Sequence, residues 1–319
     1  MRCGSKGCAM RIEGVDIEAV YGCVPANAVD NVDALAPLVG AGKAASIVQA
    51  TGFRTRRVAA EGTDVADLAL PAARLALEGS APEEIGGIIA VSFSGRNRFP
   101  AVSARLQHAL GLGCGIAAYD ISMACSGWIY GLFSAAQLVR ATGRKVLLAD
   151  GDVQSAWTES SDPNTLAVLG DGAAAALLAP GGSEWEFDFL TDGSGADTLS
   201  CRDAVSMDGF GVFRFVAGPV RRFLEGFMSG SSALGGERPT FVPHQANMYM
   251  VRQLAEALGL KDRLVCSGKY ANTGSSSAAL SLAEGGVRGP VLLAGFGAGL
   301  SAGAAATSLG SYRSGVVEA

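Results

Sequence analysis

The chain has 319 residues, of which 49% are hydrophobic and 17% are charged, and its formal net charge is −5. So much apolar content with so little net charge argues against disorder, and the mild acidity argues against nucleic acid, which favours a basic surface. The first ten residues carry charges and no apolar run, and the most apolar stretch, Leu166 to Pro180, is too short to span a bilayer. We therefore expect a soluble cytoplasmic protein with no nucleic-acid and no membrane partner.

The cysteine and histidine content argues against a metal centre and a disulfide framework. The seven cysteines are an odd number at irregular spacing, no Cys-x-x-Cys pair occurs, and the chain has two histidines. Zinc sites need closely spaced ligands, and disulfide frameworks are typical of short secreted chains. We expect reduced cysteines and no bound metal.

Short apolar runs alternate with longer helical segments in the first half of the chain, which predicts a layered α/β fold. Thr63 and Asp64 can cap a helix that runs through Leu77. The elements predicted after it are a strand over 85–91, a helix over 103–110, a strand over 117–121, a helix to about 142 and a strand over 145–149.

The second half repeats this plan. A strand over 241–243 leads to His244 and then to a helix that ends near Leu258. The elements predicted after it are a strand that starts at Leu264 and Val265, a turn over 271–277, a helix and a strand over 290–294.

An internal duplication is predicted from one repeated strand. The run KVLLADGD (145–152) matches PVLLAGFG (290–297), so Cys125 and Asn272 occupy equivalent strand-to-helix corners. No low-complexity linker separates the two parts. We expect an N-terminal half, 1–180, and a C-terminal half, 181–319, that share one core.

Cys125 is the first candidate for chemistry. It lies in a turn of small residues between a strand and a long helix, where unpaired amides and the helix dipole favour a thiolate. A free cysteine is also a common small buried hydrophobe. Taken alone, Cys125 is better explained by this second interpretation.

Two other corners and one loop carry further candidates. His244 in FVPHQAN can donate a hydrogen bond or transfer a proton, or it can be a surface or satisfied core histidine. Asn272 in YANTGSSS can serve chemistry or can cap a helix. The run GFGAGLSAG (295–303) lacks the lysine of a nucleotide-binding loop. Its glycines serve either to present backbone amides to a thioester oxygen or to allow close packing.

Together these motifs resemble the β-ketoacyl-acyl-carrier-protein synthase III family of the thiolase superfamily. The matching runs are TGFRTRR (51–57), DISMACSGW (120–128), LGDGAAAALL (169–178), VPHQAN (242–247), ANTGSSS (271–277) and GFGAG (295–299). The resemblance implies an α/β thiolase-like fold with two duplicated halves in a five-layer αβαβα arrangement. It gives Cys125 and dimerisation to the N-terminal half, and His244 and Asn272 to the C-terminal half.

The resemblance also implies an acyltransferase that forms a carbon–carbon bond. Cys125 would take an acyl group from a coenzyme A or carrier-protein thioester, with the oxyanion bound by its own amide and one from the loop of Gly297 and Gly299. His244 and Asn272 would bind the oxygen of a malonyl thioester, whose loss of CO₂ gives the attacking enolate. Thioesters of coenzyme A or phosphopantetheine are substrates in this scheme, and no cofactor is expected.

Several side chains stand at positions that bind substrate in the family: Phe99, Arg96, Arg98, Phe213, Arg214 and Phe296. Phe99 lies in the segment that reaches the partner subunit's acyl pocket in family members, so a homodimer is expected. Arg96 and Arg98 are either solvated loop residues or partners for a carboxylate on the primer. Arg214 stands where the family has a basic contact for an acyl carrier protein.

The chain departs from the family where coenzyme A binds. Its runs GKAASIVQATG and DPNTLAVLGDG lack the tryptophan and the arginine that hold the adenine. This weakens the case for an ordinary fatty-acid initiator and leaves fatty-acid, polyketide and other secondary or cofactor pathways open. Two other functions stay open: an acyltransferase that delivers to an oxygen or nitrogen nucleophile, and a non-catalytic partner subunit of a condensing complex.

Overall fold

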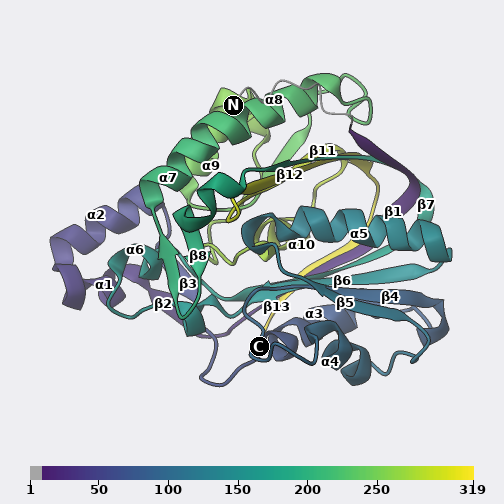
Figure 1. Ribbon diagram of the computed structural model, residues 1–319, viewed down its shortest axis with the longest axis horizontal. Coiled ribbons are helices and arrows are strands. Elements are labelled where there is room, and N and C mark those ends of the chain that lie inside the picture. The colour runs from purple at the N-terminus through teal and green to yellow at the C-terminus, as the bar shows by residue number, and fades with distance from the viewer. Residues whose placement is uncertain (1–8) are drawn as a thin grey trace.

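The computed structural model describes residues 9–319, so Cys3 and Cys8 lie outside the described residues. Most of its strands form one hydrogen-bonded network in the order β10-β11-β12-β7-β6-β4-β5, and β1 pairs with both β7 and β13 (Figure 1). The strands of this network are β1 (Met10–Val24), β4 (Ile85–Val91), β5 (Ala117–Ile121), β6 (Lys145–Asp152), β7 (Gly172–Thr191), β10 (Thr240–Pro243), β11 (Gly289–Gly297), β12 (Ser301–Leu309) and β13 (Arg313–Glu318).

Helices and two short hairpins complete the chain. The hairpins pair β2 (Ala28–Asp30) with β3 (Thr55–Arg57), and β8 (Leu199–Cys201) with β9 (Val205–Met207). The α-helices are α1 (Asn31–Val39), α2 (Ala41–Thr51), α3 (Val65–Leu77), α4 (Val102–Ala109), α5 (Gly127–Thr142), α6 (Pro163–Leu166), α7 (Gly209–Phe215), α8 (Arg221–Gly230), α9 (Met248–Ala257) and α10 (Ser276–Ala283). No helix within residues 9–319 is both long and apolar enough to cross a membrane.

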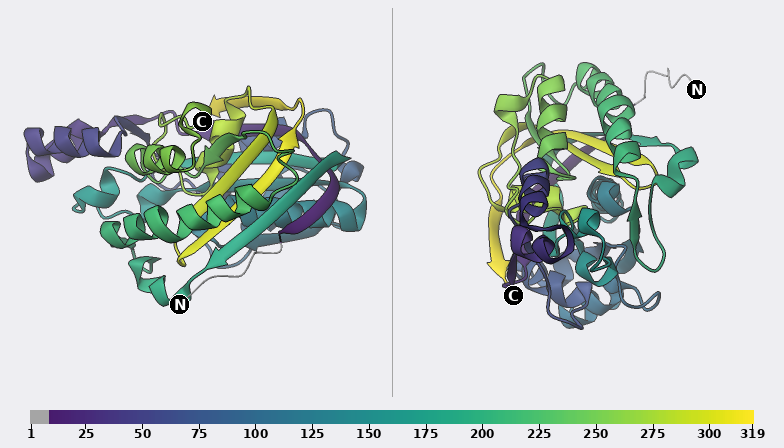
Figure 2. Two further views of the ribbon diagram at one scale, coloured as in Figure 1. Left: turned by 90° about the horizontal axis from the view of Figure 1, so that it is seen from above. Right: turned by 90° about the vertical axis from the view of Figure 1, so that its left-hand side faces the viewer.

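Two curved sheets, joined by β1 and β7, enclose two helices. The first part of β7 pairs with β6, its last part pairs with β12, and β1 runs antiparallel to β7 along most of its length. Helices α5 and α10 lie between the sheets, α3 and α4 cover the sheet of β4, and α7, α8 and α9 cover the sheet of β11 (Figures 1 and 2). The predicted five-layer αβαβα arrangement is confirmed. The division into halves 1–180 and 181–319, whose boundary falls within β7, stays a prediction.

Local sequence signals explain where two central helices begin and end. α3 begins after Asp64, whose carboxylate accepts a hydrogen bond from the amide of Ala66 at 3.0 Å, and the amide of Asp64 donates to Asp67 in return. α5 ends at Thr142 because Gly143 adopts the left-handed conformation that closes a helix. Both boundaries agree with the sequence-based expectation.

Most predicted strands have their expected places, and one is wrong. β4 and β5 have the predicted bounds. No strand starts at Leu264 and Val265, where the described chain makes only one isolated bridge, from Leu264 to Phe241. The amide of Val265 donates to the carbonyl oxygen of Phe241 in β10 at 2.9 Å, but the pairing does not continue, and the amide of Gly268 donates to the side chain of Gln245 at 2.9 Å.

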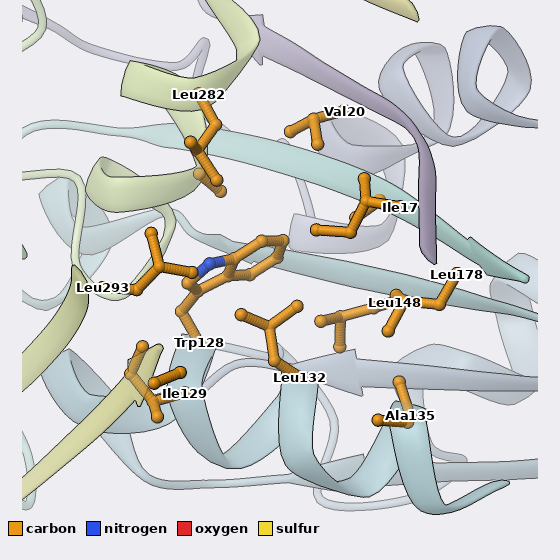
Figure 3. Packing of buried hydrophobic residues seen from close by; sticks show 14 of the residues in the cluster. Ile17, Val20, Trp128, Ile129, Leu132, Ala135, Leu148, Leu178, Leu282 and Leu293 are labelled. Carbon is orange, nitrogen blue, oxygen red and sulfur yellow. The ribbon is translucent and has the colours of Figure 1, made fainter. Parts of the chain in front are cut away.

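The core between the sheets holds the helix that follows Cys125. Trp128 and Leu132 of α5 are buried and lie among Leu148 of β6 and Leu293 of β11 (Figure 3). Burial of an aliphatic side chain of this size stabilises the fold by about 1.5–3 kcal/mol relative to an exposed one. The first turns of α5 are therefore fixed from both sheets, and so is the turn before them.

Candidate active site

Cys125 lies in a tight turn between β5 and α5. The residue before it, Ala124, has a φ of 42°, a left-handed conformation that is uncommon for alanine, and the turn Ala124–Ser126 leads directly into α5. The hydroxyls of Ser126 and Ser301 lie 2.7 Å apart and connect this turn to β12. The turn presents a partly exposed Cys125 at the N-terminal end of α5.

The loop between β11 and β12 lies directly against the Cys125 side chain. A Cβ atom on Gly297 would lie 2.7 Å from Cβ and 3.0 Å from Sγ of Cys125, so no larger residue fits there without a shift. Within the predicted loop of Gly297 and Gly299, the backbone amide that favours the charged form of the sulfur and lowers its pKa belongs to Ala298. The amide of Cys125 itself acts on the pKa of the sulfur in the same direction, so two backbone amides favour the charged form of the sulfur.

The thiol of Cys125 is neutral at pH 7 in the free protein. Burial, followed by the Asp152 carboxylate, raises its pKa to about 12, and the amides of Ala298 and Cys125 oppose this shift only in part. The position of Cys125 at the N-terminal end of α5 therefore does not lower the pKa of its thiol below the usual value in the protein without substrate. The loss of water around the sulfur outweighs the two amides.

His244 is a buried neutral imidazole at the end of β10. Its Nδ1 lies 2.9 Å from the carbonyl oxygen of Gly274 and 3.0 Å from Oγ of Ser277. The carbonyl oxygen of Gly274 can only accept a hydrogen bond. We therefore assign the ring proton of His244 to Nδ1 and the lone pair to Nε2. Burial lowers the pKa of His244 to about 4, with the Gly274 carbonyl opposing the shift. The ring is thus neutral at pH 7.

Asn272 is held from both sides by backbone groups. The backbone amide of Asn272 donates to the carbonyl oxygen of Val168 at 3.0 Å, and its backbone carbonyl accepts from the amide of Gly170 at 2.9 Å. Its side-chain Oδ1 accepts from the amide of Gly274 at 2.9 Å. Gly274 therefore bonds to the carboxamide of Asn272 through its nitrogen and to the imidazole of His244 through its oxygen.

The three corners meet where β10, β11, α5 and α10 come together. The backbone amide of His244 donates to β11 at 2.7 Å, and β11 ends at the loop that lies against Cys125. A Cβ atom on Gly127 would lie 3.4 Å from Oγ of Ser275, so the start of α5 contacts the start of α10. The structure brings the turns of Cys125, His244 and Asn272 into one region.

Three of the predicted substrate-binding residues lie beside His244 and along α7. Phe296 is buried, and its ring centroid lies 5.6 Å from that of His244. Phe213 stacks on Tyr249 of α9 with ring centroids 6.5 Å apart, and Arg214 is exposed on the same helix as Phe213. These positions place Phe296 beside His244, Phe213 partly buried against α9, and Arg214 on the surface.

The other three predicted residues lie exposed in the segment between β4 and α4. Arg96, Arg98 and Phe99 are exposed, and Phe99 has 86% of its surface accessible. No salt bridge to Arg96 or Arg98 occurs within residues 9–319. Their role in binding a substrate stays a prediction.

Two buried carboxylates at the end of β6 escaped the sequence analysis. Asp150 accepts a hydrogen bond from Oγ of Ser275 at 2.6 Å, and Asp152 accepts from both the amide and the hydroxyl of Ser94. A usable signal was present, because acidic residues at the carboxyl end of a buried strand in an α/β fold often face a site. The run KVLLADGD carries two of them.

The sequence of the chain matches a known family in two family models and in relatives. The family described as 3-Oxoacyl-[acyl-carrier-protein (ACP)] synthase III matches residues 119–197, and its C-terminal model matches residues 238–309. A relative from Geobacillus kaustophilus, beta-ketoacyl-[acyl-carrier-protein] synthase III, is 32% identical over 274 residues, which cover 82% of this chain and 88% of the relative. The chain belongs to the 3-oxoacyl-[acyl-carrier-protein] synthase III family. The two matched ranges contain Cys125, His244 and Asn272.

Solved structures extend the similarity to the whole fold. A 3-oxoacyl-(acyl-carrier protein) synthase from Burkholderia xenovorans LB400 has a TM-score of 0.90 at 28% identity, covering 99% of this chain and 100% of its own. The priming β-ketosynthase from the R1128 polyketide biosynthetic pathway has a TM-score of 0.83 at 29% identity, covering 93% and 97%. The thiolase-like fold expected from the sequence is confirmed, and the synthase III family is one of condensing enzymes.

Proposed function

We propose that this synthase III family member acylates Cys125 from a thioester and condenses the acyl group with a malonyl thioester. The observation that supports this most is the close approach of the β11–β12 loop to Cys125, where Gly297 leaves no room for a Cβ atom and the amides of Ala298 and Cys125 favour a negative charge. Fixed donors at a developing oxyanion stabilise a transition state more than the neutral ground state. The same pair binds the carbonyl oxygen of the incoming thioester and later that of the acyl-enzyme.

The first half-reaction transfers the acyl group. The sulfur of Cys125 attacks the thioester carbon, the bond to the carrier's sulfur breaks, and the thiol proton ends on the departing carrier thiol. The free thiol is poorly ionised, so this step depends on a thioester seated at the amides of Cys125 and Ala298. His244 is not needed as a permanent ion-pair partner, because its imidazole is neutral.

The second half-reaction consumes one proton. The malonyl carboxylate leaves as CO₂, the enolate attacks the acyl carbon, and the sulfur of Cys125 departs and regains its proton. Nδ1 of His244 already donates to Gly274, so a donor at Nε2 requires the imidazolium form. A bound malonyl carboxylate favours that form, and His244 then donates with Asn272 to the enolate oxygen before protonating the sulfur.

A homodimer is the proposed assembly. β5 is an edge strand that pairs only with β4 among the described strands, and its residues Ala117 to Asp120 are exposed. An exposed edge with apolar residues such as Tyr119 is a template for pairing with another chain. The exposed Phe99 is then available to the acyl pocket of the second subunit, as the family resemblance implies.

The proposed acyl donor is a coenzyme A or carrier-protein thioester, and the proposed primer carries a carboxylate. Arg214 on α7 and Arg252 on α9 are exposed and offer cations to an acidic carrier protein. Arg96 and Arg98, brought to the partner's pocket with Phe99, match a carboxylate geometrically. Turnover of acetyl, octanoyl and dicarboxylic acyl thioesters tests the primer class, and a strict preference for neutral primers rejects it.

The function as a whole is tested by intact-mass analysis with a panel of acyl thioesters. Wild-type protein should gain the mass of one acyl group, and Cys125→Ala should gain none. Addition of a malonyl thioester should then remove the acyl mass and release CO₂. Acyl loss to an alcohol or amine without CO₂ release would instead indicate transfer to an oxygen or nitrogen nucleophile.

A further inference from the structure

Two carboxylates lie side by side along β6 behind the Cys125 turn. Asp150 and Asp152 are only 1% and 0% exposed. Every hydrogen bond to Asp152 goes to Oδ1, which accepts from Ser92 Oγ at 2.8 Å, Ser94 Oγ at 2.8 Å and the amide of Phe93 at 3.0 Å. Oδ2 of Asp152 is buried without a partner, and so is Oδ2 of Asp150.

The contacts of this pair lead to the candidate active site. Asp150 accepts a hydrogen bond from Oγ of Ser275. This Oγ lies close to Gly127, the first residue of α5, because a Cβ atom added to Gly127 would lie 3.4 Å from it. A Cβ on Gly274 would lie 2.8 Å from the free Oδ2 of Asp152. The parallel strands β4, β5 and β6 all end beneath the turn that carries the nucleophile.

Within the described part of the chain neither Asp150 nor Asp152 has a salt bridge, and the buried cation Arg56 interacts with Asp171 instead. The other titratable groups of this region are His244, which is neutral, Cys201 of the β8–β9 hairpin, and Asp171 in the loop before β7. Like charges in a buried site repel one another and any further anion nearby. Burial raises the pKa of Asp150 well above its usual value and that of Asp152 to about 6, so Asp152 is mostly ionised at pH 7.

We propose that Asp150 and Asp152 form an electrostatic brake that disfavours the thiolate form of Cys125 until an acyl thioester is bound. The inference rests on the proposed role of Cys125 as acyl acceptor. Acylation converts a thiol, which could ionise to an anion, into a thioester, which cannot. Once the S–C bond has formed, the sulfur therefore carries no charge for the carboxylates to repel. The pair therefore favours the acyl-enzyme over the free thiolate, and it protects the resting thiol from electrophiles. Both residues act through Cys125 and are positioning residues.

The bonding pattern makes amide variants suitable tests. In Asp152→Asn the amide oxygen can keep all the bonds that Oδ1 accepts, while the new NH₂ takes the place of the unpartnered Oδ2. Asp150→Asn is matched in the same way, because Ser275 donates to one oxygen only. Exposed Asp33 on α1 provides the control Asp33→Asn, which removes the same charge far from a buried site.

The experiment measures alkylation of Cys125 by iodoacetamide as a function of pH, followed by mass spectrometry of the Cys125 peptide. It needs no acyl substrate, so it stands even if the proposed condensation fails. We expect Asp152→Asn to lower the pH midpoint by about one unit, as removal of one nearby buried charge does. At a fixed pH below the midpoint the larger thiolate fraction should raise the alkylation rate. The rise should be only about threefold, because a less basic thiolate is also less nucleophilic. Asp150→Asn should shift the midpoint in the same direction by less, since the Asp152 carboxylate raises the pKa of Cys125 more than the Asp150 carboxylate does.

The midpoint separates an electrostatic role from a structural one. Asp33→Asn should leave it unchanged, and the thermal unfolding of each variant shows whether the fold is intact. Folded Asp152→Asn and Asp150→Asn proteins with the wild-type midpoint, or with a higher one, would overturn the proposal. Failure of both variants to fold would also reject it, because the carboxylates would then serve the fold itself.

Discussion

His244 and Gly274 are joined by a hydrogen bond of 2.9 Å from Nδ1 to the carbonyl oxygen. This bond fixes the ring and its tautomer, so any donor that the imidazole offers to substrate must come from an added proton on Nε2. The amide of Gly274 also bonds to the side chain of Asn272. A change at either His244 or Asn272 that moves Gly274 would therefore also move the other side chain. The second half-reaction should therefore be sensitive to either residue.

His244→Ala should separate the two half-reactions. We expect acylation of Cys125 to continue, because the two amides at the sulfur are untouched, while condensation falls by about 10²–10³-fold through loss of one oxyanion donor. The measurement compares acyl mass gained by the protein with CO₂ released from a malonyl thioester. An equal loss of both steps would contradict the division of roles.

Gly297→Ala should impair acylation itself. The added methyl would lie 2.7 Å from Cβ of Cys125, so either the sulfur or the loop amide has to move. A displacement of this kind at a reacting atom costs about 10²-fold in rate. Gly193→Ala is the matched control, since its added Cβ meets nothing within 4 Å. Comparable acylation rates in the two variants would show that the close approach is unimportant.

Glu186 should stabilise the fold above pH 4.5 and lose this effect as the pH falls. Burial alone would raise its pKa, but hydrogen bonds from Ser231, Ser232 and Arg11 outweigh burial and lower the pKa to about 2. A carboxylate with a depressed folded-state pKa contributes stability above its unfolded pKa, and this contribution disappears between about pH 4.5 and 2.

Glu186→Gln tests that contribution. We expect the variant to lose about 1–3 kcal/mol at pH 7, the usual contribution of hydrogen bonds to a charged group, and to show a flatter decline in acid. Urea unfolding across this pH range measures both. Glu225→Gln, which breaks an exposed pair with Arg221, should change stability by less than about 1 kcal/mol. Parallel acid profiles for wild type and Glu186→Gln would refute the assignment.

The proposed dimer should depend on the edge strand β5. Ala118 is exposed in the middle of this strand, and Ala118→Lys places a charge where a second copy would pair. We expect wild-type protein to sediment as a dimer and the variant to shift toward monomer at the same concentration. Leu38→Lys, at an exposed position of α1, should remain dimeric. A monomeric wild-type protein would contradict the assembly.

Periodicity and turn chemistry predicted much of the fold because local signals and burial agree in it. The apolar run of β4 is buried along its whole length, and Asp64 caps α3 through the backbone bonds that its side chain favours. The strand expected at Leu264 stops after one bridge to Phe241, and the amide of Gly268 then bonds to the side chain of Gln245, a residue about twenty positions away in sequence that no local pattern reveals. Tertiary hydrogen bonds override local preference there.

The candidate site was predictable in its residues but not in its electrostatics. Cys125, His244 and Asn272 stand in recognisable motifs, whereas the direction of the thiol's pKa shift depends on burial and on Asp152, which a different strand supplies. One amide of the loop of Gly297 and Gly299 was expected to serve the oxyanion, but backbone donors carry no side-chain signal that would single out Ala298.

The most direct test is a single turnover of acyl-Cys125 enzyme, prepared from a thioester and freed of excess donor, with a malonyl thioester. The account predicts that the acyl mass leaves the protein, CO₂ is released in equal amount, and the product is a β-ketoacyl thioester. It also predicts that Asn272→Ala keeps the acyl group bound. Release of the acyl group as a free acid without CO₂, or an acyl group found on a residue other than Cys125, would contradict it.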